Sequence, residues 1–390
     1  MSWPMVSIES VAKVITGKTP PKADPNCFGG NIPFITPSEL TDSDYLLKPE
    51  TTLTEKGLAT TKLIPKNSIL VCCIGSLGKM AIADLPVATN QQINSVIFDD
   101  DKIYYRFGFY ALKLLKNDLK KIAPSTTVAI INKSRFSELK IPCPPLEEQK
   151  RIATILDKAD GIHKKREQAI KLADDFLRAT FLAMFGDPVE NPKRWDVASL
   201  LEYGSFKNGM NFTKGESGSV LKCLGVGNFK SLATITCMDN IGEIELNTLP
   251  SDDYLLKDGD IVFVRSNGNK ALVGRCLTIY PGKEKVTFSG FCIRYRIENT
   301  AITPEYLNFL FRTPSMKQQM LSGGQGANIQ NISQGTLSAL RIPVPPLDKQ
   351  IAFAKLVDFH ASIVKKQYDK MAESEKLFNA LTGDFFTFNE

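Results

Sequence analysis

The sequence contains one proline-rich junction twice, and this repetition limits the possible folds more than any other feature. Residues 141–150 read IPCPPLEEQK, and residues 342–350 read IPVPPLDKQ. Proline fixes φ, lacks an N–H and disfavours the α conformation in the residue before it, so an extended segment ends at each junction. Acidic residues follow at once, Glu147 and Glu148 in the first copy and Asp348 in the second. Because negative charge is stabilised near a helix N-terminus, a helix is predicted to begin at both places.

The repetition extends beyond the prolines to two complete halves of the chain. The segment INKSRFSELKIP at 131–142 corresponds to ISQGTLSALRIP at 332–343, and a tryptophan, Trp3 or Trp195, begins each half. Between tryptophan and junction, each half has short β-type runs separated by Gly, Pro and Asn, and one helical stretch. The sequence therefore predicts two equivalent bodies, each followed by a long helix.

Each junction is followed by a long charged run with apolar residues on one helical face. A helix of this length would be about 60 Å long at 1.5 Å per residue. Two such helices can bury their apolar faces against one another as an antiparallel pair, whereas the alternative is that each packs on its own domain. The predicted helix-pair interface consists of Ile152, Ile155, Leu156, Ile162, Ile170, Phe176, Leu177, Leu356, Val357, Ile363, Met371, Leu377 and Leu381.

The predicted fold class is α+β, with two α/β-type domains joined by two long antiparallel coiled-coil helices in a pseudo-two-fold internal repeat. A chain of 390 residues fits two such domains with connecting helices. The predicted boundaries are residues 1–146 for the first domain and 147–186 for the first helix, then 187–346 for the second domain and 347–390 for the second helix.

Composition excludes several classes of protein. No uncharged apolar run approaches the length of a membrane span, and the N-terminus lacks the pattern of a signal peptide, so a cytoplasmic protein without a membrane partner is expected. The eight cysteines form no C-x-x-C pair and there are only two histidines, which argues against metal chemistry and histidine catalysis. No nucleophile with a neighbouring base can be identified, so the chain is predicted not to be an enzyme. The net charge of +6 is compatible with a nucleic-acid partner.

A glycine-containing turn follows a β-type run in each half. GSLGKM at 75–80 is not a phosphate loop of an NTPase, because Cys73 and Met80 replace the required glycine and hydroxyl. Hydroxyls, amides and cations on such turns suit phosphate and base contacts, although a solvated turn would look the same. The candidate DNA-binding residues here are Ser76 and Lys79 in the first half and Arg265, Ser266, Asn267, Asn269, Lys270 and Arg275 in the second.

An amide cluster, NQQIN at 90–94, is a second candidate, comprising Asn90, Gln91, Gln92 and Asn94. Asn and Gln can bind adenine through N6 and N7, while a capped turn is the structural alternative. The corresponding segment KVTFSGFC in the second half lacks these amides. If these turns contact bases, the two halves recognise different sequences.

Two further pairs of polar loops, one member of each pair in each half, complete the candidate set. Early loops with lysines suit phosphate contact, or are simply solvated; they contribute Lys18, Thr19, Lys22, Lys207, Asn208, Asn211 and Lys214. Loops just before the proline junctions could contact DNA or cap a helix; they contribute Thr127, Asn132, Gln325, Asn328, Gln330 and Asn331.

The doubled IP-x-PPL-x-x-Q motif, the SILVCCIGSLGK turn and the NQQINSV segment together resemble the specificity subunit of type I restriction-modification systems. The resemblance covers essentially the whole chain. It implies two target-recognition domains on double-stranded DNA, each binding half of an asymmetric bipartite site, at a spacing set by the helix pair. It also implies two modification subunits and a restriction subunit as partners. No cofactor would be bound by this chain, and S-adenosylmethionine, ATP and magnesium would belong to the partners.

Two other classes of protein remain open from the residues alone. A non-enzymatic adaptor could use the same helices as a spacer between two protein-binding domains, and a salt titration of duplex binding would distinguish it. A standalone methyltransferase would need to bind S-adenosylmethionine, but an Asn/Asp-Pro-Pro-aromatic motif is missing from the sequence.

Overall fold

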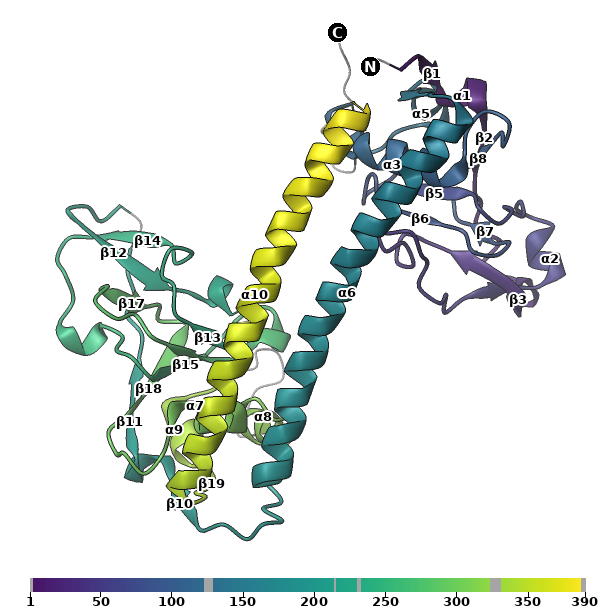
Figure 1. Cartoon of the computed structure of the whole chain (residues 1–390). Helices are drawn as coiled ribbons and strands as arrows, with labels where there is room; N and C mark the ends of the chain where they lie inside the picture. The colour runs from purple at the N-terminus through teal and green to yellow at the C-terminus, as the bar shows by residue number, and fades with distance from the viewer. Residues whose placement is uncertain (1–2, 123–128, 214, 230–232, 323–330, 387–390) are drawn as a thin grey trace. The chain divides into compact units, whose positions relative to one another are not determined.

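The computed structural model describes the chain except residues 1–2, 123–128, 214, 230–232, 323–330 and 387–390 (Figure 1). It divides into two compact units. The first unit contains residues 1–166 and 369–390, and the second contains residues 167–368. Each long helix therefore contributes one part to each unit.

The first unit is built on two main sheets, because its short apolar runs pair with partners distant in sequence. The larger sheet is fully antiparallel and buries Ile69, Val71 and Val96 against the helices. Its order is β2 (Ala12–Thr16), β8 (Ile93–Phe98), β5 (Ile69–Cys72), β6 (Met80–Ile82). The smaller sheet is β4 (Thr52–Leu53), β3 (Phe28–Ile35), β7 (Ala88–Thr89), and β1 (Met5–Ser7) pairs with β9 (Lys140–Pro142). The helices of this body are α1 (Ile8–Val11), α2 (Glu55–Leu58), α3 (Tyr105–Leu114), α4 (Lys116–Ile122) and α5 (Lys133–Ser137).

The second unit repeats this order of strands. Its larger sheet is β11 (Gly204–Asn208), β18 (Cys292–Ile297), β15 (Asp260–Val264), β16 (Cys276–Ile279), with β13 (Thr234–Ile235) added at the edge. The smaller sheet is β14 (Glu243–Leu246), β12 (Ser219–Leu224), β17 (Val286–Phe288), and β10 (Val197–Ser199) pairs with β19 (Arg341–Pro343). The helices are α7 (Pro304–Phe311), α8 (Pro314–Ser322) and α9 (Gln334–Ser338). The matching topologies confirm the predicted α+β internal repeat.

The two long helices begin at the proline junctions. Helix α6 runs from Leu146 to Phe185 and α10 from Leu347 to Phe386, 40 residues each. Helix α6 ends at Gly186, whose φ of +80° suits a C-terminal cap. The sequence suggests a similar stop near Gly383, but α10 continues past that glycine. The last residue of α10, Phe386, is buried and stacks on Phe107, and this burial offsets the cost of about 1 kcal/mol of a helical glycine.

Within each unit, α6 and α10 are antiparallel neighbours. In the first unit, Arg166 of α6 hydrogen-bonds to Lys370 O and Ser374 Oγ of α10. In the second unit, Phe181 of α6 packs edge-on against Phe353, 5.4 Å between ring centroids. Later residues of α6 meet earlier residues of α10, which confirms the antiparallel pair.

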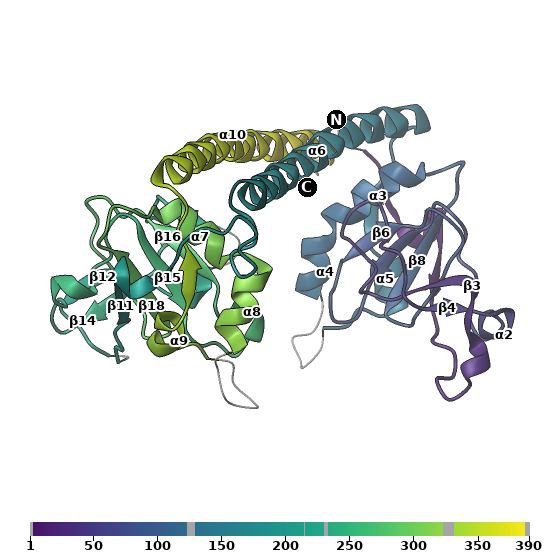
Figure 2. The ribbon, with the colours of Figure 1, turned by 90° about the horizontal axis from the view of Figure 1, so that it is seen from below.

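The apolar faces of these helices are buried differently from the prediction. Ile152 and Leu156 belong to the core of the first body, and Leu177 belongs to that of the second, so the helices pack on the bodies as well as on each other. Figure 2 shows α7 lying between the sheet of the second body and the helix ends above it. Among the predicted interface residues, the side chains of Ile162, Phe176, Leu356 and Leu377 are exposed. Their assignment to the helix interface is corrected, because the buried face instead runs through residues such as Phe181 and Phe353.

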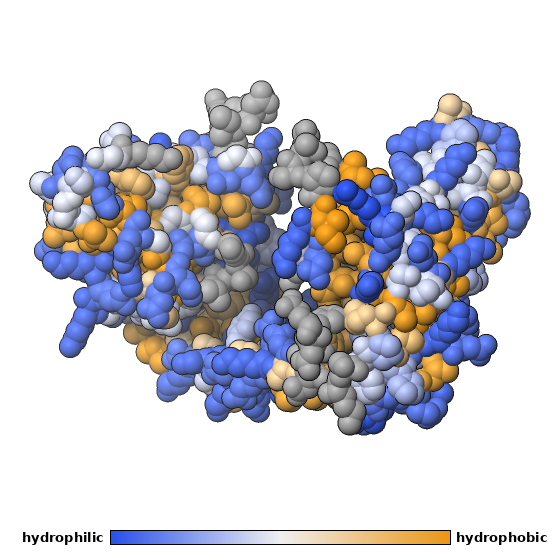
Figure 3. All heavy atoms as spheres, turned by 90° about the horizontal axis from the view of Figure 1, so that it is seen from above, coloured by the Kyte–Doolittle hydropathy of each residue, from blue (hydrophilic) through white to orange (hydrophobic). Residues whose placement is uncertain are grey.

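Among the residues that the structure describes, no helix is long and apolar enough to cross a membrane. In the same part of the chain, no three His, Cys, Asp or Glu side chains come together in a way that could hold a metal ion. On the face shown in Figure 3, hydrophilic side chains are interspersed with smaller groups of hydrophobic ones.

Candidate nucleic-acid interface

Each proline junction is fixed to its body by a fully buried glutamine, Gln149 or Gln350. Gln149 accepts a hydrogen bond from Tyr104 N and donates to Lys102 O and Pro144 O, each at 2.8 Å. Gln350 makes the same three bonds in the second half, to Thr303 N at 2.9 Å, Ala301 O at 3.1 Å and Pro345 O at 2.7 Å. We call this arrangement the glutamine clamp. It explains why the motif includes a glutamine three residues after the leucine, a role that the sequence pattern did not reveal.

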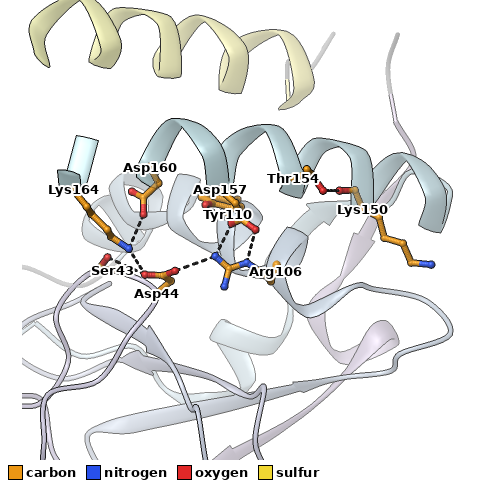
Figure 4. Close-up of polar contacts among 9 residues, drawn as sticks. All are labelled: Ser43, Asp44, Arg106, Tyr110, Lys150, Thr154, Asp157, Asp160 and Lys164. Atoms are coloured by element: carbon orange, nitrogen blue, oxygen red, sulfur yellow. Dashed lines mark hydrogen bonds and ion pairs between the residues drawn. The ribbon is translucent and has the colours of Figure 1, made fainter. Parts of the chain in front are cut away.

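A polar network adds a second attachment in the first unit (Figure 4). Arg106 of α3 donates two hydrogen bonds of 2.6 Å to Asp157 of α6, and a third of 3.0 Å to Asp44. Tyr110 donates to Asp157 at 2.7 Å, and Lys164 forms an ion pair with Asp44. Burial alone would raise the pKa of Asp44, but the hydrogen bonds from Lys164 and Arg106 outweigh it and lower that pKa.

The second unit replaces this network with aromatic packing. Because Tyr104 and Thr303 hold equivalent places in the glutamine clamp, Glu305 and Phe309 correspond to Arg106 and Tyr110. Phe309 packs against Phe353 of α10 at 5.1 Å between ring centroids. The two bodies therefore meet the helices through the same backbone geometry but different side chains.

The glycine turn of the first body connects β5 to β6. Gly75 and Gly78 adopt φ values of +80° and +74°, which glycine tolerates, and Gly75 N donates to Ala129 O at 3.0 Å. Ser76 is exposed on this turn. Lys79 is partly exposed, and its ammonium donates to Pro37 O at 2.9 Å. The turn and the loop before the proline junction are thus adjacent. Of the two predicted contacts, Ser76 is the more exposed, and the ammonium of Lys79 is already hydrogen-bonded.

Burial corrects half of the predicted amide cluster. Asn90 and Asn94 are only 6% and 2% exposed. The Asn90 side chain donates to Gln92 Oε1 and accepts from Gln92 N, and Asn94 donates to Cys73 Sγ at 3.3 Å. These amides stabilise the turn and are withdrawn from bases, so the capped-turn alternative describes them. Gln91 is exposed and Gln92 partly so.

The early loop of the first body lies beside this amide turn. Lys18 N donates to Thr89 O at 3.0 Å, and Thr19 Oγ1 donates to Gln91 Oε1 at 2.6 Å. The side chains of Lys18 and Lys22 are exposed. The structure therefore brings together two loops that are about 70 residues apart in sequence, Thr19 and Gln91 being separated by 72 positions.

The second body has the same arrangement of loops with other side chains. Arg265 N donates to Phe291 O at 2.8 Å, Ile332 N donates to Arg265 O at 3.0 Å, and Ser266 pairs with Asn331. Arg265, Ser266 and Asn267 are partly exposed, whereas Asn208, Asn211, Asn269, Lys270 and Asn331 are exposed.

Several predicted contacts in the second body have structural partners. Lys207 forms an ion pair with Asp253 and lies 4.1 Å from the centre of the Tyr254 ring. Arg275 donates to Phe229 O at 3.2 Å. Asn269 caps a short 3-10 turn by accepting from Ala271 N at 3.0 Å.

The loops that precede the junctions are capped as helix starts. Asn132 accepts from Arg135 N at 2.9 Å and caps α5, which supports the capping alternative for this residue. In the second body Ser333 caps α9, so Asn331 is not the capping residue. The remaining candidates, Thr127, Lys214, Gln325, Asn328 and Gln330, lie outside the described residues.

The fold and its paired loops define a protein with two homologous bodies, each presenting polar turns at one end of the strands of its larger sheet and each fixed to the same two helices. The family model for the type I restriction modification DNA specificity domain matches residues 2–172 and 213–370. The chain belongs to this family. It is a sequence-specific DNA-binding subunit of a type I restriction-modification system and not a catalytic component.

Individual relatives agree with the family match. The type I restriction enzyme MjaVIII specificity subunit of Methanocaldococcus jannaschii is 26% identical over 96% of this chain and 90% of the relative. The MjaIX specificity subunit of the same organism is 28% identical over 68% of this chain and 66% of the relative. The crystal structure of a type I restriction-modification S subunit from M. genitalium superposes with a TM-score of 0.56 at 18% identity, covering 100% of this chain and 97% of that one. This last likeness supports the fold.

Proposed function

We propose that residues 1–146 and 187–346 are two target-recognition domains, each binding one half of an asymmetric bipartite site on double-stranded DNA. The main support for this proposal is that equivalent turns in the two bodies hold different side chains. Cys73 N donates to Gln92 O at 2.8 Å in the first body, and Arg265 N donates to Phe291 O at 2.8 Å in the second. Identical backbone positions with different side chains suit two domains of one architecture that recognise different base sequences.

The exposed and partly exposed residues on these turns are the proposed DNA contacts. Lysine and arginine would neutralise phosphates, while amides and hydroxyls would reach base edges. In the first domain they are Lys18, Thr19, Lys22, Ser76, Gln91 and Gln92. In the second they are Asn208, Asn211, Arg265, Ser266, Asn267, Lys270 and Asn331.

The spacing between the half-sites is proposed to depend on α6 and α10. Helix α6 contributes Ile152 to the first core and Phe181 to the second, so the chain between the bodies is a continuous helix. Inserting one heptad into both helices keeps each apolar face in register. It should lengthen the preferred spacer by about 3 bp, since seven residues span about 10.5 Å and one base pair about 3.4 Å. An unchanged spacer would contradict this role of the helices.

The proposal extends to the partners that the resemblance to the family implies. Two modification subunits and a restriction subunit would complete the system in the cytoplasm, and S-adenosylmethionine, ATP and magnesium would be bound by those subunits. Coexpression of this chain with its modification subunits, followed by copurification and measurement of the mass of the complex, tests this composition.

Mapping methylated bases in the host genome tests the recognition proposal most directly. Deleting the gene for this chain should abolish methylation at one bipartite, asymmetric motif, and restoring it should return the same motif. Exchanging residues 1–146 for the corresponding domain of a relative should change one half of the motif only. A continuous or palindromic motif, or a change in both halves, would contradict the assignment of one half-site to each domain.

A further inference from the structure

A phenylalanine occupies the turn between β17 and β18 with its side chain outward. Phe291 is 61% exposed, although its neighbours Ser289 and Cys292 are buried. Gly290 N donates to Met210 O at 2.7 Å, which places this turn beside the early loop, where Phe212 is 40% exposed. Single exposed apolar residues are common on proteins. Phe291 is a candidate for DNA contact because of the residues that surround it.

Phe291 lies where segments bearing proposed DNA contacts converge. Its carbonyl accepts from Arg265 N, and a Cβ added at Gly290 would lie 2.0 Å from Asn211 Oδ1, so the amide of Asn211 is packed against the turn. Ser266, next to Arg265, pairs with Asn331. An aromatic ring among cationic and amide side chains on three segments suits contact with DNA better than contact with an apolar protein surface.

The position of Phe291 has an equivalent in the first body. Gly17 N donates to Ile93 O at 3.2 Å and Gly209 N donates to Cys292 O at 3.0 Å, so Ile93 and Cys292 are equivalent. The residue before each is therefore also equivalent, Gln92 in one body and Phe291 in the other. The first body places an amide at this position and the second a phenyl ring.

We propose that Phe291 determines part of the specificity of the second domain by contacting the C5-methyl group of a thymine in its half-site. This inference rests on the proposed function and adds the chemical group that is recognised. The thymine methyl is the apolar group exposed in the major groove, and Phe is among the side chains that contact it. An amide at the equivalent position, Gln92, matches adenine instead. The two domains would thus differ at one backbone position in the polarity of the base edge they bind.

The test uses the complex of the full chain with its modification subunits and a duplex carrying the mapped site. Each thymine of the second half-site is replaced in turn by deoxyuridine, which lacks only the methyl group, and Kd is measured by competition. The wild-type complex is expected to bind about fourfold more weakly at one position, the ratio that corresponds to ~0.8 kcal/mol per buried methylene-sized group. Phe291→Ala should bind the natural duplex several-fold more weakly and show no further loss with deoxyuridine at that position.

Matched variants separate this contact from a general effect. Leu249→Ala removes another side chain of the second body, 51% exposed, and should keep the full thymine preference. Phe291→Leu keeps an apolar side chain and should retain part of that preference. Thermal unfolding of Phe291→Ala should match the wild type, because the ring is largely exposed in the free protein.

Three results would overturn the inference while leaving bipartite recognition intact. These are a second half-site without thymine, a wild-type complex indifferent to every deoxyuridine, and a Phe291→Ala complex that keeps the wild-type deoxyuridine penalty. If the complex does not prefer the mapped duplex over a scrambled one, the proposed function fails, and this inference fails with it.

Discussion

The glutamine clamp gives the sharpest prediction about stability. Replacing Gln149 by leucine keeps a similar volume but removes the partners of Tyr104 N, Lys102 O and Pro144 O. A buried polar group without a partner costs about 1–3 kcal/mol. Tyr104 is half-buried and Lys102 is exposed, so water can reach part of this site and the lower end of the range applies. At about 1 kcal/mol for each of the three groups, less about 1 kcal/mol regained from the apolar side chain, Gln149→Leu should destabilise the first unit by about 2 kcal/mol.

Gln149→Glu adds a test with a definite pH dependence. The carboxylate can accept from Tyr104 N but cannot donate to the two carbonyls, whereas the protonated acid can donate to one of them. Burial therefore raises the pKa of the introduced acid in the folded state above its unfolded value. The folded state then binds more protons, so this variant should lose stability as pH rises from about 4 through the raised pKa.

Urea unfolding of the full chain at several pH values measures both effects, and hydrogen exchange at the Tyr104 amide reports the broken contact directly. Gln168→Glu changes an exposed glutamine of the same helix and should have little effect. Gln350→Leu should reproduce the loss in the second unit. Wild-type stability and undiminished protection of the Tyr104 amide in Gln149→Leu would refute the clamp.

Two other variants test the packing and charge of each unit. Phe353 is fully buried among Phe181, Phe185 and Phe309, so Phe353→Ala should cost about 3–5 kcal/mol in urea unfolding, and a loss below 1 kcal/mol would contradict the cluster. The lowered pKa of Asp44 means that its contribution to stability is present above its unfolded pKa near 3.8 and is lost as pH falls through the lower folded value. Asp44→Asn should therefore be less stable than the wild type at pH 7, and the difference should shrink as the pH falls below 3.8 in acid unfolding. A difference that stays constant over that range would contradict the role of Asp44.

The packing of the long helices on the bodies explains why only some of their buried residues could be predicted from the sequence. Ile152, Leu156 and Leu177 follow from periodicity alone, and all three are buried. Phe176 has the same apolar character but is 69% exposed, while Phe181, on the same predicted apolar face, is buried. Periodicity identifies an apolar face but not which edge of that face the sheets and α7 cover.

The turns that carry the candidate DNA contacts also show what a local sequence pattern leaves open. The positions of the turns followed from glycine and polar residues in the sequence, and they occur where expected in both bodies. Which side chain points outward depends on strand register: Asn94 lies within β8 and is buried, whereas Phe291 precedes β18 and is exposed. A search for polar residues in turns does not find Phe291, whereas its position in the repeat, equivalent to that of Gln92, does indicate it.

The sequence by itself determined the internal repeat, the two long helices and their start at the doubled proline junction, because these depend on local φ limits, charge near helix termini and apolar spacing. Tertiary structure alone decided that Gln149 and Gln350 clamp the junctions and that Asn90 and Asn94 are withdrawn from the surface. It also brought Phe291 beside Arg265. These outcomes depend on hydrogen-bond partners and burial contributed by segments far apart in the chain, which no local pattern records.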